Sequence, residues 1–303
     1  MGINKLLHLF PYLAKRGHFK WMPDKTYLRI MYYSQIGKQL HIDNPKTFNE
    51  KLQWLKINDR KDIYTTIVDK CEAKTYVSER IGSKYIIPTY GVWDKYEDID
   101  FDKLPDQFVL KCTHDSGGLI ICYDKSHLDK CAAERKIKKS LKNNYYYFGR
   151  EWPYKNVRPR IIAEKLMVSN DPKQRVLNDY KLQCFNGKFD NIMVCEGRFS
   201  VRGVRYYYFD RDWTYIPYCP YDDLDYSILP SLKPQCFEEM IRIAEVLSLG
   251  FPQLRVDLYE IDGCVYFGEL TLFSQSGFDN DITPEADIIL GSKLDLTTVR
   301  KDR

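Results

Sequence analysis

Residues 255–271 read Arg-Val-Asp-Leu-Tyr-Glu-Ile-Asp-Gly-Cys-Val-Tyr-Phe-Gly-Glu-Leu-Thr, a stretch that predicts a β-hairpin. Apolar residues lead into and out of Asp262-Gly263, which is a strong hairpin turn signal. The two strands therefore run antiparallel. Asp257 lies five residues before Asp262 and Glu269 lies six after Gly263, so we expect these two acids nearly opposite each other across the ladder.

Two carboxylates in such a pairing repel each other unless something positive lies between them. A divalent cation removes the repulsion, and magnesium prefers the oxygens of one or two protein carboxylates together with nucleotide phosphates. The acid pair of Asp257 and Glu269 therefore predicts a magnesium site. The alternative interpretation is two solvated acids at the edge of a sheet.

Residues 108–122 read Phe-Val-Leu-Lys-Cys-Thr-His-Asp-Ser-Gly-Gly-Leu-Ile-Ile-Cys and predict a strand, a polar glycine-rich loop and a second strand. Lys111 ends an apolar run, and the following loop offers backbone amides and hydroxyls to phosphate oxygens. The chain contains no GxxxxGK[ST] motif, so this is not a Walker loop. Alone, the pattern is more typical of a surface lysine beside a turn. Together with the acidic hairpin it predicts half of a nucleotide clamp.

The order of these motifs resembles the ATP-grasp superfamily, whose members hold ATP between two α+β lobes and usually activate a carboxylate as an acyl phosphate. Within it, the sequence is most similar to the TupA-like ATP-grasp proteins, which are associated with teichuronopeptide and other bacterial surface polysaccharides. The phrases that carry this resemblance lie at residues 47–56, 87–93, 111–117, 143–152, 179–187 and 268–271.

The resemblance implies a role for each motif. Lys70 and Lys111 resemble the two phosphate lysines, and Arg255 resembles the catalytic arginine, whose alternative role is a salt bridge to Asp257. The flap over the phosphates corresponds to Thr113, His114, Ser116, Gly117 and Gly118, the adenine-reading strand to Glu164, Lys165 and Leu166, and the magnesium ligands to Asp257, Glu269 and Thr271. The commonest superfamily form ends Glu-x-Asn, where this chain has Thr271.

Several of these residues keep a second interpretation. Asp179 and Lys181 either meet ribose or phosphate or are exposed alternate residues of a sheet. His114 either touches phosphate or substrate or caps its own loop. Residues 274–277 follow the hairpin where related ligases hold the carboxylate, but they also form a Ser/Gly turn.

The expected fold class is α+β: an ATP-grasp fold with two α+β lobes around ATP and a helical N-terminal segment. Thr47-x-x-Glu50 predicts a capped helix start, and helices are also expected over 126–142 and from Pro234 to Gly250. The segments we predict are a basic amphipathic segment at 1–45, a helical and α/β lobe with Lys70 at 46–105, a small lobe with the phosphate loop at 106–160, and a large lobe with the magnesium hairpin at 161–295.

Composition favours an intracellular enzyme. The 303 residues include 46 basic and 42 acidic ones, a mixture without the footprint of nucleic-acid binding. The nine cysteines form no CxxC pair, and we expect them to be reduced in the cytoplasm. Residues 1–25 alternate apolar and basic residues, which predicts either a peripheral contact with the inner membrane or packing on the body, with Pro11 interrupting any long helix.

These observations predict an ATP- and Mg²⁺-dependent ligase that joins a carboxylate to an amine. The expected substrates are small molecules, with a carboxylated sugar or glycan as the carboxylate. The alternatives are a sugar or lipid kinase with the same ATP site, and a glycosyltransferase-like or glycan-binding protein of the same pathway.

Overall fold

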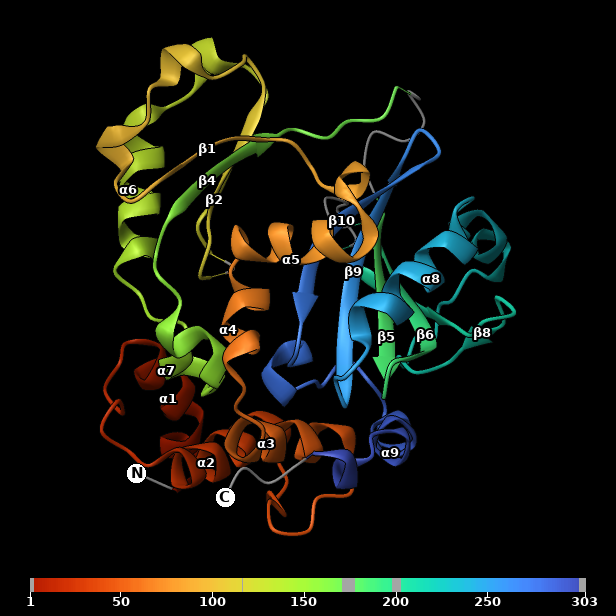
Figure 1. Ribbon diagram of the computed structural model, residues 1–303. Helices are drawn as coiled ribbons and strands as arrows, with labels where there is room; N and C mark the ends of the chain where they lie inside the picture. Colours follow the sequence, from red (N-terminus) through yellow and green to blue (C-terminus); the bar gives the residue numbers. More distant parts are fainter. Residues whose placement is uncertain (1–2, 116, 171–177, 198–202, 300–303) are drawn as a thin grey trace.

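The computed structural model describes residues 3–115, 117–170, 178–197 and 203–299 (Figure 1). The helices are α1 Ile3–Lys15, α2 Asp24–Ile36, α3 Phe48–Asn58, α4 Asp62–Val68, α5 Glu72–Ile81, α6 Lys130–Leu141, α7 Tyr146–Gly149, α8 Phe237–Ser248 and α9 Pro284–Lys293. The strands are β1 Thr89–Trp93, β2 Phe108–Cys112, β3 Leu119–Cys122, β4 Ile161–Lys165, β5 Asp179–Phe185, β6 Lys188–Glu196, β7 Arg205–Phe209, β8 Tyr215–Ile216, β9 Gln253–Ile261 and β10 Cys264–Thr271.

The strands form two antiparallel sheets, and each sheet has its own hydrophobic core. The small sheet has the order β1-β4-β2-β3 and packs against α6, whereas the large sheet has the order β10-β9-β5-β6-β7-β8 and packs against α8 (Figure 1). Helix α5 links the two halves of the molecule. It packs on α8 of the large-sheet half, and its Lys74 pairs with Glu164 of β4 in the small sheet. This arrangement is the α+β fold with two lobes that the sequence predicts.

Strand β4 differs from the sequence interpretation. We expected residues 161–165 to begin the large lobe, but β4 lies inside the small sheet between β1 and β2. The helices α3 to α5, which precede the small sheet in the chain, contribute to the core of the large sheet instead. The sheet to which β4 belongs and the core to which α3 to α5 belong are decided by contacts between residues far apart in sequence. Local periodicity does not encode such contacts.

The two faces of the large sheet have opposite character. On β9, Leu254, Val256 and Leu258 are buried toward the core with α8, whereas Arg255 and Asp257 alternate to the other face. Helix α8 presents the apolar side predicted between Pro234 and Gly250. Polar and charged residues therefore collect on the face of the sheet that α8 leaves uncovered.

The acidic hairpin forms as predicted, with one added feature. Asp262 and Gly263 both have positive φ, at 51° and 73°, as a type I′ turn requires. Counting evenly from this turn would place Gly268 opposite Asp257, but a bulge between Phe267 and Glu269 brings Glu269 there instead. A Cβ at position 268 would lie 3.0 Å from the backbone oxygen of Asp257, so the bulge needs its glycine.

Other local predictions are confirmed. Thr47 and Glu50 form the reciprocal capping box at the start of α3, and α6 and α8 lie within the helical segments expected at 126–142 and 234–250. Helix α1, by contrast, continues through Pro11, which the sequence suggested would interrupt it.

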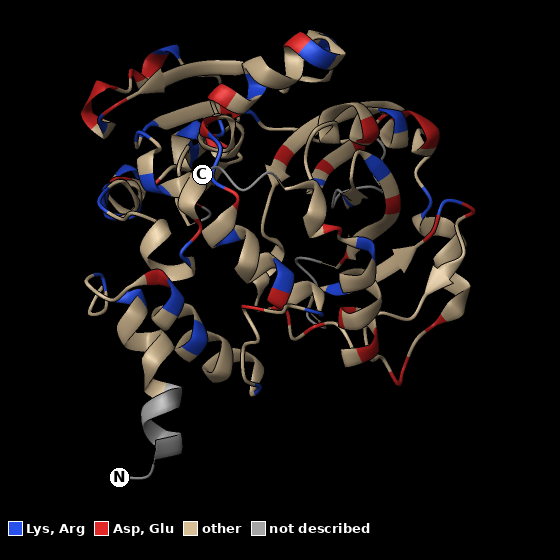
Figure 2. Ribbon diagram, turned by 60° about the horizontal axis from the view of Figure 1, so that its bottom comes forward, with Lys and Arg blue, Asp and Glu red and all other residues tan. Residues whose placement is uncertain are grey.

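The N-terminal segment packs on the body of the protein. Phe10 and Ala14 of α1 join Tyr27 and Met31 of α2 in a third small core, while Trp21 remains 77% exposed. Among the described residues, no helix has the length and apolar character needed to cross a membrane. Basic and acidic residues are interspersed over both lobes in Figure 2. A peripheral membrane contact through residues 1–25 stays a prediction.

Candidate functional site

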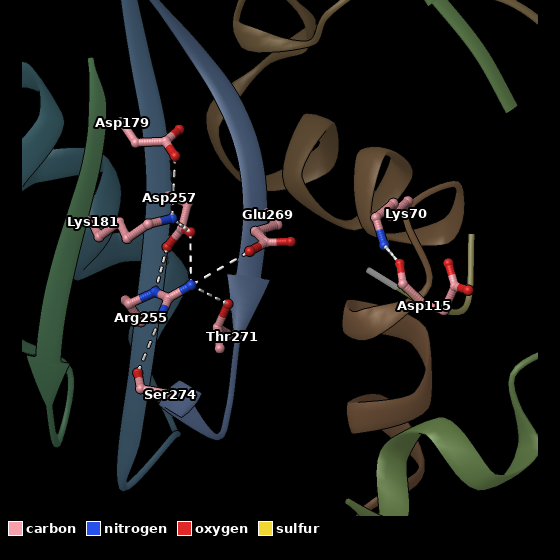
Figure 3. A network of polar contacts seen from close by, with 9 residues as sticks. All are labelled: Lys70, Asp115, Asp179, Lys181, Arg255, Asp257, Glu269, Thr271 and Ser274. Atoms are coloured by element: carbon pink, nitrogen blue, oxygen red, sulfur yellow. Dashed lines mark hydrogen bonds and ion pairs between the residues drawn. The ribbon is translucent and has the colours of Figure 1, made fainter. Parts of the chain in front are cut away.

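A cavity lies between the two sheets, and we call it the interlobe cavity. From the small-sheet side, its lining includes Lys70, Lys111, Gly118 and Glu164. From the polar face of the large sheet, its lining includes Asp179, Lys181, Asp257, Tyr259 and Glu269. Figure 3 shows Lys70 facing the carboxylates of the hairpin from the opposite side. The structure therefore brings the distant lysine and acid motifs of the sequence to one place.

On the large sheet, the charged residues stand in adjacent register positions. Lys181, Asp257 and Glu269 face one another across β5, β9 and β10 (Figure 3). Arg255 donates from Nε to Asp257 Oδ1 at 2.7 Å and from Nη2 to Oδ2 at 2.8 Å, and Lys181 Nζ also contacts Oδ2. Glu269 Oε1 is 3.4 Å from Arg255 Nη2, and its side chain stays 46% exposed to the cavity.

These contacts set the charge state of the group. Burial by itself raises the pKa of Asp257, but the adjacent Arg255 and Lys181 outweigh it and lower that pKa to about 2. Burial likewise opposes the charge of Lys181, yet Asp257 holds its pKa above the ordinary value. Asp257 is therefore an anion clamped by two cations, and Glu269 is the carboxylate more available to a ligand.

On the small-sheet side, two lysines share one carboxylate. Glu164 of β4 binds Lys111 of β2 at 2.6 Å and also Lys74 of α5. Burial raises the pKa of the Glu164 carboxyl, but the two ammonium groups overcome this effect and hold its pKa below the ordinary value. Lys74 is a residue that the sequence interpretation missed, although it follows Lys70 by four positions.

The glycine-rich loop is held by its own side chains. Asp115 accepts a hydrogen bond from the Gly118 amide at 3.1 Å and one from Ser140 Oγ, and its backbone oxygen accepts from Lys70 Nζ. The Gly118 amide, predicted to bind phosphate, thus already has an intramolecular acceptor. Burial lowers the pKa of Lys70, since its ammonium group leaves bulk water.

Two loop residues point away from the cavity. Thr113 is fully buried and its hydroxyl lies 3.3 Å from the backbone oxygen of Arg158. His114 is 2% exposed, with Nε2 3.1 Å from the backbone oxygens of Ser140 and Asn143, so it anchors the loop to the end of α6. We therefore leave both out of the proposed nucleotide site. Gly117 is exposed, and Ser116 lies outside the described residues.

In the segment predicted to contact adenine, part of the backbone is already hydrogen-bonded within the small sheet. Glu164 lies within the ladders to β1 and β2, and the Lys165 amide donates to the backbone oxygen of Pro88 at 2.9 Å. Leu166 is the first residue beyond the strand and is half-buried. Adenine recognition here stays a prediction, with Leu166 as its best-placed member.

Two further cavities adjoin the first, and Glu269 lines all three. The sheet-face cavity lies on the polar face of the large sheet, lined by Lys181, Gln183, Tyr206, Tyr208 and Arg255 among others. The aromatic cavity lies beside the end of β10 and includes Thr271 and Ser276 in its lining. Thr271, a predicted magnesium ligand, accepts from Arg255 Nη2 at 3.0 Å.

The electrostatic division of the interlobe cavity limits what can bind there. Around Glu164 the cations exceed the carboxylates, whereas on the hairpin side three carboxylates meet two cations. A ligand that carries both a polyanion and a metal cation complements this division. Within the described residues, no group of three or more His, Cys, Asp or Glu can hold a metal by itself.

Comparison with known proteins gives one family. Residues 50–295 match the model of the family described as TupA-like ATPgrasp. No curated protein sequence matches the chain.

Three solved structures that resemble the chain share little sequence identity with it. D-alanine–D-alanine ligase from Bacillus anthracis complexed with ATP is 18% identical over 77% of this chain and 63% of that one, with a TM-score of 0.41. The corresponding ligase from Helicobacter pylori is 12% identical over 82% and 69%, with a TM-score of 0.45. ATP-grasp ligase PsnB complexed with minimal precursor is 12% identical over 80% and 67%, with a TM-score of 0.39. This chain thus spans less than two thirds of the Bacillus ligase, and the family model carries the assignment.

Proposed function

This chain belongs to the TupA-like ATP-grasp family, and we propose that it is an ATP- and magnesium-dependent ligase that joins a carboxylate to an amine. The proposed reaction transfers the γ-phosphoryl group of ATP to a substrate carboxylate, giving an acyl phosphate and ADP. The amine then displaces phosphate and forms an amide. Members of this superfamily are typically ATP-dependent ligases.

The observation that carries this proposal is the division of charge across the interlobe cavity. Lys111 and Lys70 lie on one side, and the carboxylates of Asp257 and Glu269 lie on the other. A triphosphate against the lysines and a cation against the acids would neutralise both sides at once. A cavity of one sign would favour a metal-free anion or a bare cation instead.

Magnesium fits the donor set of the hairpin. Glu269 offers a half-exposed carboxylate, and Asp257 opposite it is fully ionised near neutral pH because of Arg255 and Lys181. One or two carboxylates completed by phosphate oxygens is a usual magnesium environment. When bound, the ion would supply charge neutralisation to the β and γ phosphates.

The other residues of the site would bind the phosphates and stabilise charge that develops during the reaction. Lys111 and Lys70 would neutralise phosphate oxygens, and Lys74 would keep Glu164 neutralised while Lys111 turns to the nucleotide. Arg255 lines both neighbouring cavities, where it can stabilise the oxyanion that forms when the amine attacks. Its clamp on Asp257 fixes the guanidinium in advance, so both roles proposed from the sequence are compatible.

The proposed carboxylate substrate is a carboxylated sugar in bacterial capsule or surface polysaccharide synthesis, in the cytoplasm. The sheet-face cavity supports a hydroxyl-rich ligand. Gln183 is 93% buried there, and its Nε2 has no hydrogen-bond partner in the described part of the chain, so it can donate to a hydroxyl oxygen. Tyr206 and Tyr208 also line this cavity, and aromatic residues are suited to packing on sugar rings.

An ADP-release screen that crosses amino acids with uronic acid nucleotide sugars tests this function. The proposal expects magnesium-dependent release of ADP and free phosphate that requires both substrates, and a hydroxamate when hydroxylamine replaces the amine. A stable phosphorylated product without free phosphate would identify a kinase. Binding of UDP-sugars without ATP would identify a glycosyltransferase-like or glycan-binding protein.

A further inference from the structure

The aromatic cavity has a composition that the nucleotide does not explain. It has a volume of about 400 Å³ and lies beside the interlobe cavity, with which it shares Lys70, Asp115 and Glu269. Its lining also includes five aromatic residues, Tyr145, Phe148, Tyr154, Phe273 and Phe278, together with Glu151. Aromatic faces around a buried carboxylate are a favourable environment for an organic cation.

Glu151 is a buried carboxylate. It is 4% exposed, and Ser276 Oγ donates a hydrogen bond to its Oε1. In the described part of the chain it forms no ion pair within 4.0 Å, in contrast to Asp257 and Glu164. Burial raises its pKa, and the charge of Lys56 only partly opposes that effect. A carboxylate in this position gains from a further cation at close range.

Lys56 cannot supply that contact, because its ammonium group is already used. Its Nζ donates to Gln53 Oε1 at 2.9 Å and to the backbone oxygens of Gly149 at 2.6 Å and Ser276 at 2.7 Å. An ammonium group has three donors, and all three are accounted for. Its Nζ also lies 4.7 Å from the ring centroid of Phe278, so the rings of this region already accommodate one ammonium group.

The backbone next to Glu151 is held in a strained form. Gln275 and Ser276 have φ of 47° and 52°, in the left-handed region that non-glycine residues rarely adopt. This conformation places Ser276 Oγ on Glu151 and the Ser276 carbonyl on Lys56 and Gln53. Such strain persists only where surrounding contacts enforce it, and it is concentrated at binding and catalytic sites.

The positive groups that line the aromatic cavity, Lys70 and Arg255, already have partners. Lys70 donates to the backbone oxygen of Asp115, and Arg255 is bound to Asp257. In the described part of the chain, neither of them forms an ion pair with Glu151. An amine bound beside Glu151 lies in the cavity that Arg255 also lines, and before it attacks the acyl phosphate its ammonium group loses one proton, which the Glu151 carboxylate can accept.

We propose that the aromatic cavity binds the primary ammonium group of the amine substrate, with Glu151 as its ionic partner and the surrounding rings enclosing its stem. This inference rests on the proposed ligase function, because it assigns the amine substrate of that reaction to the aromatic cavity. It makes Glu151 a binding residue for the amine and Ser276 the positioning residue that orients its carboxylate.

Ligand-observed NMR titration of n-butylammonium, with butan-1-ol as a neutral probe of the same number of heavy atoms, tests this site without nucleotide. We expect wild type to bind the ammonium about tenfold or more tightly than the alcohol, and Glu151→Gln to lose that preference. The exposed Glu285→Gln on α9 serves as the matched control and should behave like wild type. Equal binding of the two probes to wild type, or an unchanged preference in Glu151→Gln, would overturn the proposal.

A second variant guards against misfolding, because Glu151→Gln also removes the charge nearest to Lys56. Glu151→Asp keeps the charge but withdraws it by one methylene, so a reduced ammonium preference is expected in a protein with a normal melting curve. An unreduced preference in that variant counts against the site. Failure to bind Mg-ATP would remove the ligase function, whereas the ammonium preference, measured without nucleotide, is judged independently.

Discussion

The acidic and basic sides of the interlobe cavity are assembled in different ways. On the large sheet, Lys181, Asp257 and Glu269 are neighbours in a single register row of β5, β9 and β10. On the small-sheet side, the group around Glu164 draws one lysine from α5 and another from β2. One half of the site is thus fixed by strand pairing alone, and the other also depends on how α5 packs against the paired strands β2 and β4.

This difference predicts how each side of the cavity responds to the loss of a charged side chain. In the register row, Asp257 is clamped by two cations and is 2% exposed, so its removal leaves Lys181 and Arg255 with only the longer contacts to Asp179 at 3.7 Å and Glu269 at 3.4 Å. Around Glu164, one lysine can leave while the other remains, so Lys111 is available to a ligand at a smaller cost. We therefore expect substitution of Asp257 to lower mainly the free energy of unfolding. Substitution of Lys111 should weaken mainly the affinity for ATP.

The largest expected effect is on the acid side. Asp257→Asn removes the nearest carboxylate of both Arg255 and Lys181 and should lower the free energy of unfolding by about 3–5 kcal/mol. Urea denaturation followed by circular dichroism measures this change. The exposed Asp222→Asn should differ from wild type by less than about 0.5 kcal/mol. A similar small change in Asp257→Asn would mean that the clamp is not structural.

Glu269→Gln, on the strand paired with that of Asp257, should reduce activity without a large loss of stability. The half-exposed Glu269 has only a long contact to Arg255, so the fold should persist while magnesium-dependent ADP release falls by about 100-fold or more. The exposed Glu79→Gln on α5 is the control. Turnover at the wild-type rate in Glu269→Gln would remove this residue from the metal site.

Acid titration probes the clamp without removing it. The pKa of Asp257 is about 2 in the folded protein and 3.8 for the free side chain, so the unfolded chain takes up the proton first as pH falls. The stabilisation is present above pH 4 and should be lost between about pH 4 and pH 2, by roughly 2 kcal/mol. Chemical denaturation across this range should show a shallower loss in Asp257→Asn, and equal slopes in both proteins would contradict the assigned shift.

Lys111→Ala tests the lysine side. Because Glu164 keeps Lys74, the melting curve should stay nearly unchanged, while the Kd for ATP should rise about tenfold through loss of a charged hydrogen bond. Isothermal titration calorimetry gives the affinity, with the exposed Lys139→Ala on α6 as the control. A large drop in the melting temperature would show instead that Lys111 is structural.

The same contrast explains how far the sequence could lead. The hairpin and its opposing acids follow from a turn signal and a period of two, and only the bulge at Gly268 had to come from the structure. By contrast, the membership of β4 and the roles of Lys74 and Glu151 depend on contacts between distant segments. The family resemblance implies that Thr113 and His114 belong to the phosphate flap, with capping of the loop as the alternative for His114, and in the structure α6 and the segment before β4 bury both residues.

A double-mutant cycle on Mg-ATP affinity tests the central claim most directly. In the described part of the chain, no hydrogen bond or ion pair joins Lys111 to Glu269, so the two residues should couple only through a ligand that touches both. We predict a coupling energy of at least about 0.5 kcal/mol between Lys111→Ala and Glu269→Gln in the Kd for Mg-ATP. Strict additivity, or an Mg-ATP affinity that neither substitution changes, would contradict the account that both lobes bind one magnesium triphosphate.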